Sequence, residues 1–253
     1  VTQRVIDVER RAVQAADHVA AISTDVGDAL TERYGLAAAH TSVVSRGIDL
    51  PATAGLDEAE RTARRSALGI AADALLAVFS GSRHGPNRDA ALRVRDLARR
   101  CRGPWRFLLT GSVTQILSRE ESDGLILRPG QPWPWLTLSD LALNPMESGS
   151  GINIKMLEYL AAGIPTLTTP MGARGLGGAE DGAYRCLPLE QWQDALNDLA
   201  SHPDARRRLG AVGQVFVRDR HTAEATARAL TACIDSLASP GPSRYSMEAA
   251  RVP

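Results

Sequence analysis

Short apolar runs alternate with amphipathic stretches along most of the chain. The run at 75–79 is uninterrupted and the run at 106–110 repeats its pattern, as expected for strands buried on both faces. We predict strands at 19–23, 41–44, 75–79, 106–110, 125–127, 141–143 and 165–168, and helices at 5–16, 25–34, 87–100, 152–162 and through most of 189–237. This alternation predicts an α/β fold in which a parallel sheet carries helices on both faces.

The predicted sheet directs attention to the loops that follow its strands. In open parallel sheets, ligands bind at the carboxyl ends of the strands, where the chain turns into helices. Here those loops are 81–87, 111–114, 145–151 and 170–175, and all but the second combine glycine with a polar or charged side chain. We therefore expect the functional residues in these loops.

Composition excludes several classes of function. The chain has 253 residues and a formal net charge of zero, so no global field attracts nucleic acid or an anionic membrane. Its three cysteines lie far apart without a zinc-binding pattern, which favours a reducing compartment. No apolar run reaches the roughly 18 residues that a transmembrane helix needs.

The chain has 28 arginines and a single lysine, Lys155. This lysine follows the turn 149–151 (Gly-Ser-Gly) and precedes Glu158 by three residues, so both side chains lie on one helix face. Free amides and the dipole make such a helix start a phosphate site, and an ammonium fits a narrow site that excludes a guanidinium. The pattern predicts a nucleoside diphosphate with ribose at Glu158. The alternative is a surface ion pair worth a few tenths of a kcal/mol, which the glycine turn disfavours.

Other phosphate-binding motifs are missing from the sequence. No Walker loop, dinucleotide G-x-G-x-x-G motif or Asp-x-Asp pair occurs. We therefore predict no bound metal and no resident cofactor, with the diphosphate charge neutralised by amides, Lys155 and arginine.

Several segments together resemble a known enzyme family. The run 144–151 and the run 155–165 are similar to the signature of retaining, nucleotide-sugar-dependent glycosyltransferases of the GT-B fold. Segments 16–23, 45–49, 78–87 and 169–173 resemble other parts of that family in the same order. The resemblance covers about 16–176, and it implies two Rossmann-like domains.

The resemblance assigns roles to individual residues. It implies that Lys155 binds the phosphates and Glu158 the ribose hydroxyls, while the turn presents amides to the diphosphate or the sugar. The donor-binding residues that it implies are Gly81, Arg83, Arg128, Gly149, Ser150, Gly151, Ile152, Asn153, Lys155 and Glu158. The family often has a Glu-x7-Glu pair, but the expected position holds Ser150, so Glu147 is a shifted candidate for contact with the donor sugar. No general base is assigned.

The resemblance also implies a domain organisation. Residues 1–45 would close an N-terminal acceptor-side domain, 46–51 would be the linker, and 52–238 would form the C-terminal nucleotide-sugar-binding domain. Residues 239–253 are rich in Pro, Ser and Gly, which predicts a poorly ordered tail. Because the chain begins at Val1 and contains only the end of the first domain, we expect a fragment or a processed form.

The function implied is transfer of a sugar from a UDP-, GDP- or ADP-sugar to a glycan, lipid or small-molecule acceptor. The resemblance implies a metal-independent, retaining reaction in polysaccharide, cell-envelope or glycoconjugate synthesis. It implies a cytoplasmic enzyme, with the first domain as the candidate for contact with the inner face of a membrane. One alternative is a non-catalytic nucleotide-binding or regulatory module, which the short first domain favours. A sugar-phosphate epimerase would need an acid pair, for which the cleft offers only Glu147 and Glu158.

Overall fold

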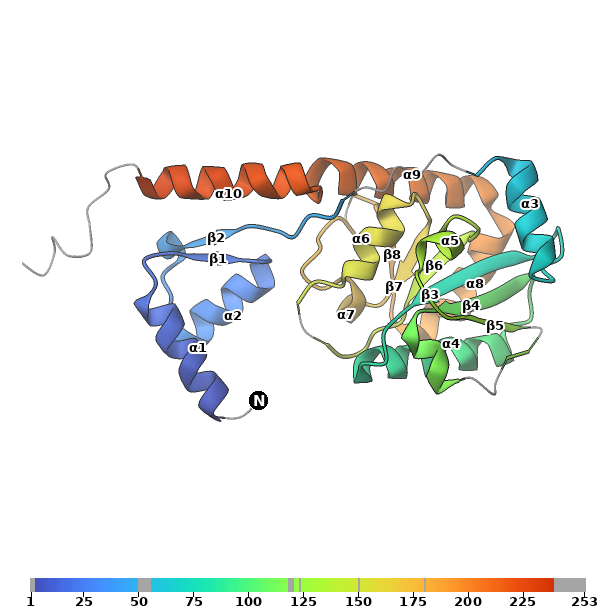
Figure 1. Cartoon of the computed structure of the whole chain (residues 1–253), viewed down its shortest axis with the longest axis horizontal. Helices are drawn as coiled ribbons and strands as arrows, with labels where there is room; N and C mark the ends of the chain where they lie inside the picture. Colours follow the sequence, from blue (N-terminus) through green and yellow to red (C-terminus); the bar gives the residue numbers. More distant parts are fainter. Residues whose placement is uncertain are drawn as a thin grey trace, which may run out of the picture. The chain divides into compact units, whose positions relative to one another are not determined.

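A computed structural model describes residues 3–49, 56–117, 121–122, 124–149, 151–179 and 181–238. By its internal contacts the chain divides into two units, Val1–Gly47 with Thr222–Pro253, and Ile48–His221 (Figure 1). The predicted domain limits stay a prediction. Residues 50–51 of the predicted linker and the predicted tail, 239–253, lie outside the described residues.

The first unit contains two short parallel strands and three α-helices among its described residues. The strands pair Val19 with Thr41 and Ala21 with Val43. Helix α2 begins after Ser23, whose hydroxyl accepts from the Val26 amide, and ends at a left-handed Gly35. The elements are α1 (Gln3–Ala15), β1 (Val19–Ala21), α2 (Thr24–Tyr34), η1 (Ala38–His40), β2 (Thr41–Val43) and α10 (Ala223–Ala238). These confirm the predicted strands and helices in this region.

The second unit is built on a six-stranded parallel sheet. Its strand order is β5-β4-β3-β6-β7-β8. The strands are β3 (Leu75–Ser80), β4 (Trp105–Thr110), β5 (Leu125–Arg128), β6 (Leu141–Asn144), β7 (Thr166–Thr168) and β8 (Arg185–Cys186). The first five strands and their parallel arrangement were predicted, whereas the two-residue β8 was not.

The strand order places a topological switch between β3 and β6. From β3 the chain moves outward through β4 and β5, and it then returns to add β6, β7 and β8 on the other side. Two loops therefore leave the centre of the sheet in opposite directions, one after Ser80 and one after Asn144. In open α/β sheets the crevice between two such loops is where ligands bind.

Helices cover both faces of the sheet (Figure 1). Helices α4 (Gly85–Arg100) and α8 (Trp192–Ser201) pack against Phe79, Phe107 and Leu109. Helices α5 (Trp133–Leu136) and α6 (Ile154–Ala161) pack against Val78 and Leu108 on the opposite face, and α9 (Pro203–Arg220) packs on α6. Because both faces are buried, the strands are apolar without alternation, which explains the sequence pattern.

Helix α3 (Glu58–Ala67) is attached by charge rather than by an apolar stripe. Arg65 is only 7% exposed, and it donates to Asp140 at 2.8 Å and to the Ala74 carbonyl at 2.5 Å. Asp140 also accepts from Arg61 at 2.6 Å and from the Leu76 amide at 2.7 Å. Burial alone would raise the pKa of Asp140, but these hydrogen bonds outweigh it and lower that pKa. The network joins α3 to the amino ends of β3 and β6.

Helices α3 and α6 also differ from the sequence prediction. Helix α3 was not predicted, because its ten residues are mostly charged or polar and its apolar residues are all alanines, too small to mark a buried face clearly. Helix α6 begins at Ile154 rather than at 152, because Gly151 has a φ of 69° and Asn153 is extended. Within the described residues, no helix is long and apolar enough to cross a membrane.

Candidate functional site

The loop after β6 forms a glycine turn before α6. Gly149 and Gly151 have φ values of 135° and 69°, which side chains rarely adopt, and Ser150 between them lies outside the described residues. Asn153 caps α6 by position, but its side chain donates to the Gly172 carbonyl at 3.0 Å instead of accepting from the helix amides. The first amides of α6 therefore have no side-chain cap, as an anion-binding helix start requires.

Lys155 lies in the first turn of α6 and has neutral contacts. Its Nζ donates to Asn87 Oδ1 at 2.5 Å, lies 3.7 Å from Met146 Sδ and sits 4.6 Å from the centroid of the Phe79 ring. Within the described part of the chain, no carboxylate forms an ion pair with it. Burial lowers the pKa of Lys155 to about 8, although the charge of Glu158 acts in the opposite direction.

Glu158 faces the same cavity one turn along α6. Its side chain is partly buried, and burial raises its pKa while the charge of Lys155 acts to lower it. The cavity has a volume of about 320 Å³, and its lining includes Gly81, Gly111, Asn87, Lys155 and Glu158. It lies at the carboxyl ends of β3 and β4 beside α6, next to the topological switch. The structure thus brings together three of the predicted donor residues: Gly81, Lys155 and Glu158.

Glycines let the backbone pack closely beneath this cavity. A Cβ on Gly111, whose φ is 90°, would lie 2.4 Å from the Gly81 carbonyl oxygen. That same carbonyl accepts from the Val113 amide at 3.0 Å. The two strand-end loops therefore approach each other as closely as only a residue without a side chain permits.

Two of the predicted cationic contacts do not line this cavity. The Arg83 side chain is exposed. The backbone amide of Arg83 donates to Ser112 Oγ, in the loop after β4, at 3.2 Å. Arg128 forms an ion pair with Glu121 at 2.6 Å and lines a different cavity that includes Arg106. Their roles in donor binding stay predictions.

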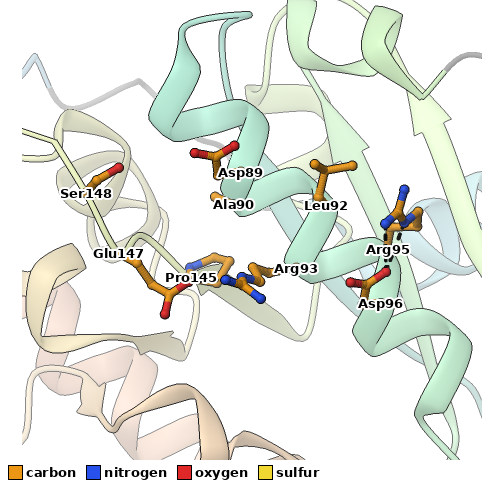
Figure 2. A pocket seen from close by; sticks show the side chains of 9 residues that line it. All are labelled: Asp89, Ala90, Leu92, Arg93, Arg95, Asp96, Pro145, Glu147 and Ser148. Carbon is orange, nitrogen blue, oxygen red and sulfur yellow. Dashed lines mark hydrogen bonds and ion pairs between the residues drawn. The ribbon is translucent and has the colours of Figure 1, made fainter.

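Glu147 also lies outside the Lys155 cavity. It lines a separate cavity of about 290 Å³ between α4 and the loop after β6. Figure 2 shows its carboxylate and the Arg93 guanidinium turned toward each other, and the two form an ion pair at 2.8 Å. Both side chains are about half exposed, so the pair holds the loop to α4 only weakly. Contact between Glu147 and a donor sugar stays a prediction.

Sequence reasoning missed other residues of the site. Asn87 was placed at the start of a helix but given no role, and its amide proves to be the hydrogen-bond partner of Lys155. Arg174, in the loop after β7, extends toward the glycine turn and donates to the Gly151 carbonyl at 3.4 Å. Position in a strand-end loop was the available signal for both.

We expect Gly172→Ala to disturb this site through packing. A Cβ there would lie 2.3 Å from Thr168 Oγ1 and 2.6 Å from Asn144 Nδ2, both of which are buried. Overpacking of this kind costs about 1–3 kcal/mol of unfolding free energy, measurable by urea denaturation. Nucleotide affinity should fall as well, because Asn153 is bonded to the same residue. Gly85→Ala, whose added Cβ meets nothing within 4 Å, is the control; equal stability of the two variants would contradict the prediction.

A family model described as glycosyl transferase-like matches residues 91–232, more than half of the chain. The chain belongs to the glycosyl transferase-like family. Membership identifies it as a transferase of the class that moves sugars, which confirms the resemblance seen in the sequence. No curated protein matches the sequence at a significant level.

Solved structures of glycosyltransferases share the fold. A glycosyltransferase from Rickettsia africae is similar with a TM-score of 0.76 at 11% identity, over 95% of this chain and 69% of that one. HepE from Anabaena, solved in complex with UDP, has a TM-score of 0.75 at 15% identity, over 95% of this chain and 69% of HepE. Sucrose-phosphate synthase from Thermosynechococcus elongatus has a TM-score of 0.74 at 16% identity, over 93% of this chain and 62% of the synthase. These likenesses confirm the predicted GT-B, Rossmann-like fold.

Metal ligands form no cluster in the residues that the structure describes. No three His, Cys, Asp or Glu side chains there lie close enough to hold an ion. Metal-independent transfer stays a prediction that rests on the sequence.

Proposed function

We propose that this glycosyl transferase-like chain binds a nucleoside-diphosphate sugar in the cavity of Lys155 and Glu158. One observation carries the proposal: the chain's only lysine is held, without a carboxylate hydrogen bond, beside an uncapped helix start at the switch point of the sheet. HepE, whose fold this chain shares, has been solved with UDP and with UDP-glucose, which supports a donor of this chemical class.

We infer a position for each part of the donor. The diphosphate would accept hydrogen bonds from the Lys155 ammonium and the first amides of α6, and Glu158 would accept from the ribose hydroxyls. Bond cleavage at the sugar leaves a diphosphate with one more negative charge. In the proposed complex Lys155 and the helix dipole would face this growing charge, so they would stabilise the transition state more than the bound donor.

The finer properties of the reaction follow from the family resemblance. We infer transfer with retention of anomeric configuration and without a metal, to an acceptor in polysaccharide, cell-envelope or glycoconjugate synthesis. A cytoplasmic enzyme acting at the inner face of a membrane fits that role. Metal independence is supported by Lys155 and the start of α6, because their positive charge would neutralise a diphosphate bound there without a metal.

A thermal-shift panel tests the donor site. UDP, GDP, ADP and their sugars are each added to the purified chain, and a matching nucleotide should stabilise it by about 2.7 kcal/mol at a hundredfold excess over Kd. Affinity should fall as the pH rises through about 8, because Lys155 then loses the proton that gives it charge. If no nucleotide stabilises the protein at any pH, the proposed donor site is wrong.

A further inference from the structure

The side-chain amide of Asn87 has one orientation that its neighbours allow. Its Nδ2 donates to Ser82 Oγ at 3.0 Å, and its Oδ1 accepts from Lys155 Nζ at 2.5 Å. An ammonium has three donors and no acceptor, so only the amide oxygen can face it. Asn87 thereby links the first turn of α4 to the first turn of α6 across the carboxyl end of the sheet.

The backbone of the loop after β3 makes room for this contact. A Cβ on Gly81 would lie 3.2 Å from Asn87 Cβ and 3.2 Å from the Phe79 ring. Those distances are tighter than ordinary packing allows, so glycine at position 81 lets the Asn87 amide rest against the loop. The ammonium is therefore held by a built arrangement of loop, ring and amide rather than by a chance surface contact.

We propose that Asn87 is a positioning residue that holds the Lys155 ammonium at the donor cavity while leaving its charge available to the diphosphate. The inference rests on the proposed function, because the anion it serves is the nucleotide of that site. Asn87 also lines this cavity, but the role assigned to it is exerted through Lys155.

The Asn87 amide is uncharged, so it does not compete with an anion for the Lys155 ammonium. The groups packed around the ammonium are Asn87 from α4, the Phe79 ring from β3 and Met146 Sδ from the loop after β6, and all three are uncharged. Among the described residues, Glu158 on its own helix is the charged group whose field reaches it. A carboxylate in place of the Asn87 amide would compete with the diphosphate for the same cation.

The single lysine permits a direct test without any nucleotide. Isotope-labelled lysine gives one side-chain NMR signal, so its titration can be followed in the whole chain. Wild type should titrate near 8. Asn87→Ala should lower the pKa of Lys155, because the charged form loses an acceptor, and Asn87→Asp should raise it. Asn197→Asp, an identical exchange on the exposed surface of α8, should leave it unchanged.

Nucleotide binding provides the second readout. At pH 7, Asn87→Asp should weaken the nucleotide that the panel selects by at least about tenfold, as expected for a charge-assisted bond lost to competition. Asn87→Ala should weaken it less, and its affinity should begin to fall at a lower pH than in wild type. Thermal stability of the unliganded variants should stay close to that of Asn197→Asp.

The two readouts separate the two claims. If Lys155 titrates identically in wild type and in both Asn87 variants, the inference is overturned, whether or not a nucleotide binds. It is also overturned if both variants bind nucleotide with wild-type affinity and pH dependence. If wild type binds no nucleotide while the titrations shift as expected, the contact is real but the proposed function is wrong, and the role assigned to Asn87 falls with it.

Discussion

Lys155→Met is expected to remove most nucleotide affinity while leaving the fold at least as stable as wild type. Methionine keeps the length of the side chain and can pack against Phe79 and Met146, and it removes a charge that burial already disfavours. A charged hydrogen bond contributes about 1.5–3 kcal/mol, so Kd should rise roughly 10- to 150-fold. Isothermal titration calorimetry gives the affinity, and a thermal melt without ligand gives the stability.

The combination of lost binding and kept stability distinguishes a ligand contact from a structural residue. Lys155→Arg is the matched variant, because it keeps the charge and replaces a compact ammonium by a planar fork. It should also bind more weakly, since the Asn87 contact and the space above the Phe79 ring fit one nitrogen. Wild-type affinity in Lys155→Met would contradict the donor site, whereas wild-type affinity only in Lys155→Arg would contradict the shape argument.

The sequence predicted the elements that are attached by burial of apolar side chains. It missed helix α3, which is attached by polar contacts. Strands β3 and β4 are covered on both faces, so their apolar runs identified them as strands of a parallel sheet, whereas the order of the strands was not predicted. Helix α3 has no such signal, because Arg65 attaches it through hydrogen bonds to residues far along the chain. Sequence periodicity reports apolar packing and contains no information about a partner such as Asp140.

The sequence predicted the site residues whose positions are determined by the backbone of a helix. Lys155 and Glu158 share a helix face at a fixed spacing, so their meeting at one cavity follows from helix geometry alone. Arg83 and Glu147 were also placed on strand-end loops, but a long side chain on a loop can turn several ways. Glu147 turns to Arg93, and the structure alone shows that direction.

The charged groups at the two ends of the sheet have different kinds of partner. At the carboxyl end, the Lys155 ammonium contacts the neutral side chains of Asn87, Met146 and Phe79. At the amino end, the Asp140 carboxylate is saturated by Arg61, Arg65 and the Leu76 amide. A saturated network resists exchange with outside ions and contributes to stability. Substitutions at the two ends should therefore separate binding from folding.

Asp140→Asn is expected to be the most destabilising of the substitutions considered, at about 3–5 kcal/mol of unfolding free energy, because it leaves the buried Arg65 without a counter-charge. Urea denaturation measures the loss. Glu60→Gln, which breaks the exposed ion pair with Arg64, is the matched control and should cost no more than about 1 kcal/mol. The lowered pKa of Asp140 means that its contribution is present above the ordinary carboxyl pKa and is lost as the pH falls through the lowered value. The difference in unfolding free energy between wild type and Asp140→Asn should therefore become smaller in acid. If that difference is small at neutral pH, or if it grows in acid, the network does not anchor α3.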